Sequence, residues 1–499
     1  MAEAANLEVE VKLGAAPGFH LPELDGVVTG VSAAKPEEMR LETTYYDTPD
    51  LRLARWGCSF RHRAGEGWTL KLPSTSDGMA LSRPEHTYPG PPRKPPAEAL
   101  SLVQAYLRRT PIDAVARLST WRRRVQLRNA EGRLLGEVVD DEVSILDGRR
   151  VAARFRELEI EIKPEGRPLL DTLIALLRSA GAGAPDKTAK HVRALGPRAT
   201  EPPEVSPAPL AEHPPAGDVV RQAIASSVEI IFRHDPGVRI GDDPEHVHQA
   251  RVATRRLRSD LGTFEKILDA EWTRLLRGEL AWLADELGRV RDAEVLRDRL
   301  RDRAMSLPAD DVRVASGIIR RLADEVDGGR EKLVVALRSD RYFKLLDMLV
   351  EGARNPVVID EEATRPAADV LPELAAKPWK KLKQAVRQLN EQSPDADLHA
   401  ARILAKRSRY AAELAARVAG KPALRFAKAV ADLQTVLGEH QDGVNAQAWL
   451  RALHSTGRQG FVAGELHALE HVATEAARAD WPRAWKALKG SELRAWMLA

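Results

Sequence analysis

The sequence has little of several things, and each shortage excludes a class of protein. Its 499 residues include one cysteine, Cys58, which excludes an intrachain disulfide and argues against a zinc site built from thiolates. Aromatic residues make up only 5%, which argues against an all-β protein and favours a large helical part. No run approaches the ~18 apolar residues of a membrane span, and the first residues do not resemble a signal peptide. We therefore expect a cytoplasmic protein with no membrane partner.

The excess of one sign of charge over the other is also small. The chain has 76 Lys and Arg residues against 73 Asp and Glu residues, a formal net charge of +3. The total charge therefore says little about partners, and only local segregation of charge can indicate a polyanionic ligand. Hydrophobic residues make up 43%, which is enough for globular cores and argues against extensive disorder.

A proline-rich segment divides the chain. Residues 196–217, GPRATEPPEVSPAPLAEHPPAG, contain seven prolines, so we expect an extended, semi-rigid linker there. Before it, segments such as LEVEVKL and RELEIEIK alternate with the period of a β-strand. After it, the period of an α-helix dominates. The sequence therefore predicts a multi-domain α+β protein, with a β-rich domain over residues 1–195 and a helical region over residues 218–499.

Charged side chains share strand faces in the β-rich domain. In LEVEVKL, Glu8, Glu10 and Lys12 alternate with apolar residues, and RELEIEIK repeats the pattern. Carboxylates two residues apart on one face repel one another unless cations lie between them. Carboxylates at this density suit Mg²⁺ or Mn²⁺, whereas Arg and Lys on neighbouring strands suit phosphate oxygens. A shared polar interior is one interpretation, and ordinary solvent-exposed strand faces are the other.

These segments resemble, in order, the CYTH domain of the triphosphate tunnel metalloenzyme family. Glu8-Val9-Glu10-Val11-Lys12 matches the ExExK signature of that family. The segments TYYDTPDLRLARWGCSFRHR, WTLKLP, SRPEH, GEVVDDEV and RELEIEIK follow in the family order, so the resemblance covers about residues 6–195. It implies an eight-stranded antiparallel β-tunnel that binds a triphosphate together with a divalent cation, Mg²⁺ or Mn²⁺.

The resemblance also implies roles for individual residues. The implied metal ligands are Glu8, Glu10, Glu137, Asp141, Glu157, Glu159 and Glu161. The implied substrate contacts are Lys12, Arg61, Arg63, Lys71, Arg83, Arg122, Arg124, Lys163 and Lys190. The implied catalytic residues are Glu8, Glu10, Lys12 and Glu159. The sequence departs from the family pattern at Ser119 and Trp121, where basic residues are expected, which leaves the phosphate clamp and the substrate open.

The helical region contains an internal repeat. HQARVATRRLRS begins at His248 and HAARILAKRSRY begins at His399, an offset of 151 residues. LGRVRDAEV begins at Leu287 and LGEHQDGVN at Leu437, an offset of 150 residues. Because the spacing inside each half is also kept, we expect two related helical units, over about residues 218–355 and 366–499.

Each repeat carries a stripe of cations. At 100° per residue, one histidine and three cations of each first segment fall within an arc of about 80°, apart from the apolar face. We find no acidic partner at i,i+4 within the stripes, so unpaired like charges predict a polyanion. A solvated helix face is the alternative. The stripes comprise His248, Arg251, Arg255 and Arg258, and His399, Arg402, Lys406 and Arg409.

The two halves resemble the CHAD domain over about residues 218–495. The resemblance implies two four-helix bundles related by a pseudo-twofold axis, with a basic surface that binds inorganic polyphosphate. It implies that both stripes contact polyphosphate, with Lys380 and Lys381 of KPWKKLK as additional contacts.

Together these features predict a metal-dependent hydrolase of inorganic triphosphate or short-chain polyphosphate, held on polyphosphate by its helical region and associated with polyphosphate granules. One alternative is a non-catalytic polyphosphate-binding or granule-associated protein. Another is a nucleoside or thiamine triphosphatase. Nucleic-acid binding is disfavoured because the stripes contain no aromatic stacking residues or base-edge readers.

Overall fold

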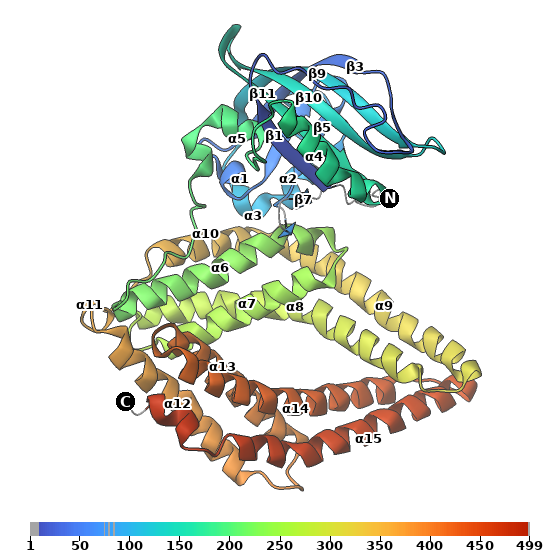
Figure 1. The fold of residues 1–499 in the computed structure, drawn as a ribbon. Coiled ribbons are helices and arrows are strands. Elements are labelled where there is room, and N and C mark those ends of the chain that lie inside the picture. The colour runs from blue at the N-terminus through green and yellow to red at the C-terminus, as the bar shows by residue number, and fades with distance from the viewer. Residues whose placement is uncertain (1–8, 74, 78–79, 83–84, 498–499) are drawn as a thin grey trace. The chain divides into compact units, whose positions relative to one another are not determined.

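The computed structural model describes residues 9–73, 75–77, 80–82 and 85–497. The chain divides into two compact units, Met1–Glu204 and Val205–Ala499. Figure 1 shows that the first unit is built around a β-sheet and that the second is helical. The predicted α+β organisation is therefore confirmed.

The first unit contains one antiparallel sheet. Its order is β6-β7-β1-β11-β10-β9-β3-β4-β5-β8, and β2 pairs with β9. Eight of its eleven described strands have four or more residues, and the other three have three residues each. The longer strands are β1 (Val9–Ala15), β3 (Glu37–Asp47), β4 (Ser59–Arg63), β5 (Gly67–Lys71), β8 (Glu85–Tyr88), β9 (Asp113–Asn129), β10 (Leu134–Asp147) and β11 (Arg150–Ile162); the short ones are β2 (Val31–Ala33), β6 (Thr75–Asp77) and β7 (Ala80–Ser82).

Period-two alternation gives this sheet an apolar face and a charged face. Leu13, Leu158 and Ile160 are fully buried on the apolar face, where they pack with Leu173 and Leu177 of α4. Glu10, Lys12, Glu159 and their neighbours therefore point to the opposite face. The helices of this unit are α1 (Arg52–Arg55), α2 (Ala97–Leu102), α3 (Gln104–Leu107), α4 (Leu170–Ser179) and α5 (Lys190–Leu195), with 3₁₀ turns over Pro164–Leu169 and Pro197–Thr200.

The proline-rich segment is not extended throughout. Its first residues form the 3₁₀ turn Pro197–Thr200, in which Ala199 is buried. Glu204 then pairs with Arg108 at 2.6 Å between carboxylate oxygen and guanidinium nitrogen. This part of the segment is thus tied to the first unit, although it was expected to be a linker. The segment ends inside α6, which begins at Ala216.

The second unit contains the predicted repeat. Its first half has helices α6 to α9 and its second half has α12 to α15, and across the halves α6 packs on α12, α7 on α13, α8 on α14 and α9 on α15. The first half has an additional helix, α10, packed on α6. The helices are α6 (Ala216–Ile240), α7 (Pro244–Thr263), α8 (Ala270–Ala304), α9 (Ala309–Leu337), α10 (Asp340–Arg354), α11 (Asp360–Ala363), α12 (Ala367–Gln388), α13 (Asp395–Ala419), α14 (Lys421–Ala452) and α15 (Gly457–Ala487).

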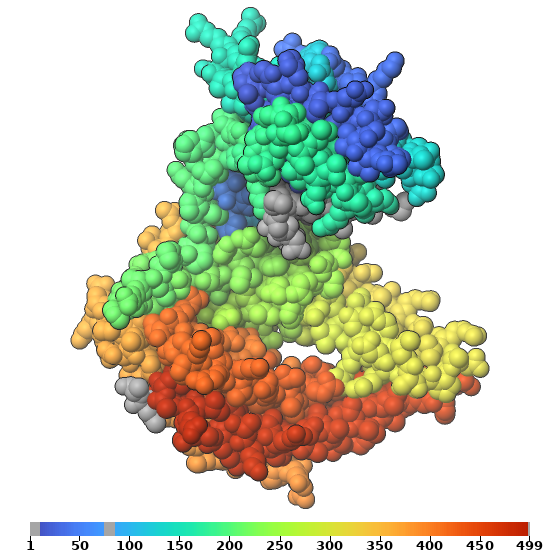
Figure 2. All heavy atoms as spheres, viewed as in Figure 1, coloured from blue at the N-terminus to red at the C-terminus, as the bar shows by residue number. Residues whose placement is uncertain are grey.

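The far ends of the two helical hairpins meet in an apolar cluster, which we call the tip cluster. Leu300 and Leu322 of the α8–α9 hairpin are fully buried there against Leu450 and Leu466 of the α14–α15 hairpin. Figure 2 shows an opening through the helical unit between these two hairpins. Among the described residues, no helix is long and apolar enough to cross a membrane.

Candidate functional site

The register of the sheet brings the charged positions of different strands together. β1 places Glu10 opposite Glu161 and Lys12 opposite Glu159 on β11. β10 pairs with β11 on its other side and with β9 beyond it. The charged face therefore extends across β10 to Arg122 on β9. Because antiparallel neighbours directly opposite each other have side chains on the same face, Lys12 offsets the charge of Glu159, whereas Glu10 and Glu161 bring two like charges together.

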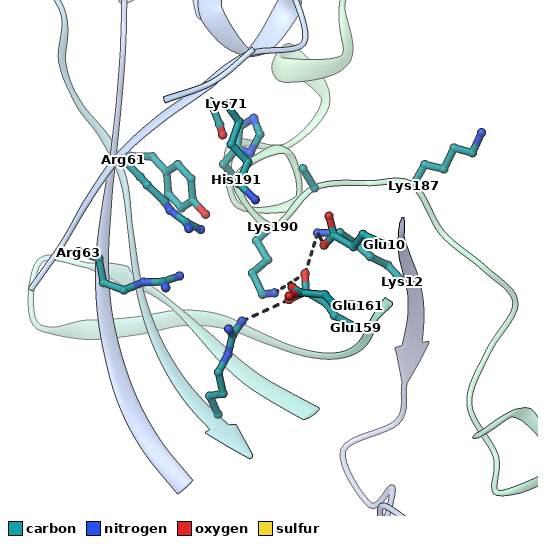
Figure 3. Close-up of a pocket in the computed structure, with 14 residues that line it drawn as sticks. Glu10, Lys12, Arg61, Arg63, Lys71, Glu159, Glu161, Lys187, Lys190 and His191 are labelled. Atoms are coloured by element: carbon teal, nitrogen blue, oxygen red, sulfur yellow. Dashed lines mark hydrogen bonds and ion pairs between the residues drawn. The ribbon is translucent and has the colours of Figure 1, made fainter. Parts of the chain in front are cut away.

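These side chains line one pocket, shown in Figure 3. Nine of the residues predicted from the sequence lie in its wall. The pocket is lined by Glu10, Lys12, Tyr45, Ser59, Arg61, Arg63, Lys71, Arg122, Glu159, Glu161, Lys187, Ala189, Lys190 and His191. Carboxylates and cations thus face the same space, which is the arrangement that a metal-bound phosphate chain requires.

Three carboxylates in the pocket fit a divalent cation. One oxygen from each of Glu10, Glu159 and Glu161 lies within 4.8 Å of the other two. Burial raises the pKa of Glu161 to about 7, and the neighbouring Glu159 and Glu10 add to this effect. Three crowded oxygen ligands of like charge suit Mg²⁺ or Mn²⁺, because a bound cation removes their mutual repulsion.

Lys12 lies between two of these carboxylates. Its Nζ is 2.9 Å from Glu10 Oε1 and 2.7 Å from Glu159 Oε1. Burial opposes the charge of Lys12, but Glu159 and Glu10 outweigh burial and raise its pKa. Lys12 is therefore an ammonium at neutral pH, with its charge next to the space that a substrate would occupy.

A second layer of ion pairs lies deeper than the pocket. Lys190 Nζ is 2.9 Å from Asp141, 2.8 Å from Glu157 and 2.8 Å from Glu159 (Figure 3 shows its approach to Glu159). Arg122 donates two hydrogen bonds to Asp141, at 2.8 and 2.6 Å. The side chains of Asp141 and Glu157 are 0% and 1% exposed. Both were predicted as metal ligands, but in the structure they bind cations and do not line the pocket.

Other predicted residues lie at the rim or away from the pocket. Arg124 pairs with Glu37 at 2.6 Å and lies 3.9 Å from Glu137, and none of these three lines the pocket. Lys163 follows β11 and is also absent from the wall. The rim cations Arg61, Arg63 and Lys71 have acidic neighbours: Glu85 at 3.7 Å, Glu66 at 2.8 Å and Glu85 at 2.8 Å. The predicted Glu8 and Arg83 lie outside the described residues.

Sequence reasoning missed five pocket residues: Tyr45, Ser59, Lys187, Ala189 and His191. The ring of Tyr45 stacks on that of His191, with centroids 5.3 Å apart, and both line the wall. Ser59 lines the pocket beside them, and in Figure 3 the ammonium of Lys187 points away from the carboxylates. Tyr45 could have been found, because it lies directly opposite Arg61 in the β3–β4 register. The others follow from packing that the sequence pattern does not encode.

The departure expected at Ser119 and Trp121 does not affect the pocket. Both residues alternate with Arg122 on β9 and therefore lie on its other face. Ser119 hydrogen-bonds to Glu42, and Trp121 is 48% exposed. The expectation that these positions alter the phosphate clamp is thus wrong.

In the helical unit, the two stripes face one another. Lys406 interacts electrostatically with Arg255 and Arg251 of the first repeat as well as with Arg402 of its own helix. α7 packs on α13, as the pseudo-twofold arrangement requires. Farther along these helices, Arg258 and Arg407 both interact electrostatically with Arg277 of α8. Cations from both repeats therefore form one group, which we call the inter-repeat cation cluster: Arg251, Arg255, Arg258, Arg402 and Lys406.

The second repeated segment supplies acidic partners for part of this cluster. Arg251 pairs with Asp292 at 2.8 Å, and Arg402 lies 3.5 Å from Asp442 at the equivalent position. This pairing explains why the two segments keep their spacing. In addition, Arg409 lies 3.5 Å from Glu413 at i,i+4. The prediction that the stripes have no acidic residue at i,i+4 is therefore wrong for Arg409, and Arg251 and Arg402 have acidic partners on another helix.

The other three cations remain without an acidic partner. Arg255, Arg258 and Lys406 are half-buried, and no hydrogen bond or ion pair is found for any of them among the described residues. Of the predicted histidines, His248 is half-buried and His399 is exposed. Lys380 and Lys381 are exposed on α12, and Lys381 acts on Glu265 rather than on the cluster.

Comparison with known proteins agrees with both halves of this description. The model of the CYTH domain matches residues 6–191, and the model of the CHAD domain matches residues 222–451. The uncharacterized protein Rv2226 of Mycobacterium tuberculosis is 33% identical over 504 residues, which cover 95% of each chain. The chain is a CYTH–CHAD protein. Its CYTH domain belongs to the triphosphate tunnel metalloenzyme family, whose members depend on divalent metal ions.

Solved structures resemble parts of this CYTH–CHAD protein. PptA from Streptomyces chartreusis is 24% identical, with a TM-score of 0.46, over 55% of this chain and 99% of its own. The CHAD domain from the plant Ricinus communis is 25% identical, with a TM-score of 0.42, over 59% and 96%. A putative adenylate cyclase from Bacillus halodurans is 18% identical, with a TM-score of 0.25, over 38% and 96%.

Proposed function

We propose that the CYTH domain hydrolyses the phosphoanhydride bonds of inorganic triphosphate or short-chain polyphosphate with Mg²⁺ or Mn²⁺, and that the CHAD domain binds inorganic polyphosphate. The observation that carries the first part is the pocket itself, in which a three-carboxylate group faces a wall of lysine and arginine side chains. A linear phosphate chain with a bound cation satisfies both sets of groups at once.

The residues of the pocket would have different roles in hydrolysis. Glu10, Glu159 and Glu161 would hold the divalent cation, which neutralises charge that develops on phosphate oxygens during hydrolysis. Lys12 and Arg122 would bind phosphate oxygens from the carboxylate side of the pocket. From the opposite wall, Arg61, Arg63 and Lys71 would bind the rest of the chain. No covalent nucleophile is needed, because positioning and charge stabilisation carry phosphoryl transfer.

The decisive experiment is phosphate release from a panel of substrates with either metal ion. The panel comprises inorganic triphosphate, pyrophosphate, ATP and thiamine triphosphate. We expect inorganic triphosphate to have the highest kcat/KM, and Glu10→Gln to reduce its turnover. Glu131→Gln, which changes an exposed carboxylate in the turn between β9 and β10, is the matched control. Faster hydrolysis of ATP or thiamine triphosphate would favour the nucleoside or thiamine triphosphatase alternative, and no hydrolysis would favour a binding protein.

Three half-buried cations without acidic partners support polyphosphate binding by the CHAD domain. Arg255, Arg258 and Lys406 are half-buried and have no ion-pair partner among the described residues, so an anion bound next to them would be favourable. A polyphosphate chain supplies one negative charge per unit and needs no base recognition. Competition between labelled polyphosphate and RNA tests this proposal, with polyphosphate expected to bind more tightly. Equal competition would mean that the cluster recognises polyanions in general.

A further inference from the structure

The inter-repeat cation cluster is not symmetric. The offset of 151 residues aligns Arg255 of the first repeat with Lys406 of the second. Arg255 keeps its charge at any physiological pH, whereas a lysine can lose its proton when it is buried among cations. The repeats therefore place a permanently charged group and a titratable group at equivalent positions of one cluster.

The surroundings of Lys406 oppose its charge from several elements. Arg255 and Arg251 face it from α7, and Arg402 faces it from its own helix α13. Asp442 of α14 opposes these cations, but Arg402 lies 3.5 Å from that carboxylate. Asp292 of α8 is occupied in the same way by Arg251. Lys406 itself is half-buried and, among the described residues, has no hydrogen bond or ion pair.

Burial and then the three guanidinium groups lower the pKa of Lys406 to about 7, although Asp442 opposes the shift. The amino group is thus partly neutral in the free protein at neutral pH. A phosphate chain that enters the cluster brings negative charge next to it and favours the ammonium. Binding and protonation must then promote each other, because linkage is reciprocal.

We propose that Lys406 makes polyanion binding by the helical unit proton-linked, so that the bound phosphate chain draws a proton onto this side chain and affinity falls as pH rises through neutrality. The inference rests on the proposed polyphosphate binding of the CHAD domain. Once protonated, Lys406 contacts the phosphate chain from the second repeat, as Arg255 does from the first repeat at every pH. Below neutrality the cluster holds the chain with both repeats fully charged, and above neutrality the second repeat contributes one cation less.

The sign and size of the effect follow from linkage. If phosphate restores an ordinary lysine affinity for protons, binding takes up about half a proton near pH 7. Between about pH 6 and pH 8, the affinity for polyphosphate should then fall about tenfold through Lys406 alone. Protonation of terminal phosphates changes affinity in the opposite direction, so long chains with few ends are the better probe.

The test is calorimetry of long polyphosphate binding to the full-length protein, near pH 7, in buffers of different ionisation enthalpy. The wild-type protein should take up about half a proton per site and lose about tenfold in affinity between about pH 6 and pH 8. Lys406→Arg should take up about half a proton less than the wild type and should lose about tenfold less affinity over the same pH interval. Lys428→Arg, an exposed lysine on α14, should behave as wild type.

The result that overturns the proposal is a Lys406→Arg variant with the same proton uptake and the same pH dependence as the wild type. Failure of polyphosphate to bind at any pH would instead overturn the proposed function itself. Because arginine keeps the charge and most of the length of lysine, circular dichroism should show both variants folded, and the comparison does not depend on a disruptive substitution.

Discussion

Both domains contain clusters of lysine and arginine, but the clusters differ in whether carboxylates pair with these cations. In the CYTH domain, Lys12, Arg122 and Lys190 each touch a carboxylate within 2.9 Å. In the CHAD domain, Arg255 and Lys406 have no such partner among the described residues. In the proposed function, the cations held by carboxylates would bind an anion that arrives with its own divalent cation, whereas the unpartnered cations would bind a polyanion directly. The two domains would thus bind the same class of ligand, a phosphate chain, with different electrostatic arrangements.

The largest effect should come from removing the metal ion. We expect a chelator to abolish triphosphate hydrolysis, by about 10³-fold or more, because the charge on the phosphate oxygens is then no longer neutralised. Binding of long polyphosphate to the same full-length protein should be unchanged, and fluorescence anisotropy in the presence of chelator measures it. If chelation weakens both activities equally, the contrast between the two domains does not hold.

The second prediction concerns the buried ion pairs of the CYTH domain. Asp141→Asn should destabilise this domain by about 3 kcal/mol, because Arg122 and Lys190 would then lie buried with one carboxylate fewer. Urea unfolding followed by tryptophan fluorescence measures the change. Asp292→Asn, which removes the acidic neighbour of a less buried arginine in the CHAD domain, is the matched comparison and should change stability little. A large loss from Asp292→Asn would mean that both domains depend on their ion pairs alike.

The third prediction separates partnered from unpartnered cations in the CHAD domain. The double variant Arg255→Gln/Arg258→Gln should weaken long-chain polyphosphate binding by about tenfold or more and make its salt dependence shallower. Arg409→Gln should have a smaller effect, because Glu413 already offsets this charge. Binding measured at several salt concentrations gives both quantities. Equal losses per arginine would show that the acidic neighbours do not matter.

The smallest effect should be a pH dependence of stability at Asp260. This carboxyl of α7 is 2% exposed, and its Oδ1 has no hydrogen-bond partner among the described residues. Burial raises its pKa to about 7, although Arg256 and Arg417 oppose the shift. The folded state then holds the proton more tightly than the unfolded state, so stability is highest in acid and falls as pH rises through about 7.

Asp260→Asn should therefore stabilise the CHAD domain near pH 8 and have little effect near pH 4. Thermal unfolding at both pH values measures the difference between the variant and the wild type. A variant that is equally stabilised, or destabilised, at both pH values would show that the Asp260 proton does not control stability.

Alternation and repetition made much of this fold predictable. The alternation of LEVEVKL and RELEIEIK placed Glu10, Lys12, Glu159 and Glu161 on charged strand faces, because period two leaves a strand only two faces, and the family resemblance implied that they share a site. The pattern could not show how deeply each charged side chain is buried. Asp141 has the same alternation as its neighbours, but it lies below the pocket wall, where Lys190 covers it.

In the helical unit, the repeat predicted which helices are equivalent, but the pairing of cations with acids was missed. Asp292 and Asp442 occur in both copies of the second repeated segment, so the signal for their contact with Arg251 and Arg402 was present. It was overlooked because partners were sought only within one helix. The convergence of the two stripes needed the packing of α7 on α13, which no local pattern encodes.

The tip cluster has a consequence for how the helical unit can be divided. Leu300 of the first repeat and Leu450 of the second are both fully or almost fully buried in it, although 150 residues separate them in the chain. A polypeptide that ends near residue 355 would therefore expose an apolar patch at the end of its longest hairpin, and two such halves would find each other through it. The tip cluster thus joins the two repeats, and we expect neither repeat to be stable without the other.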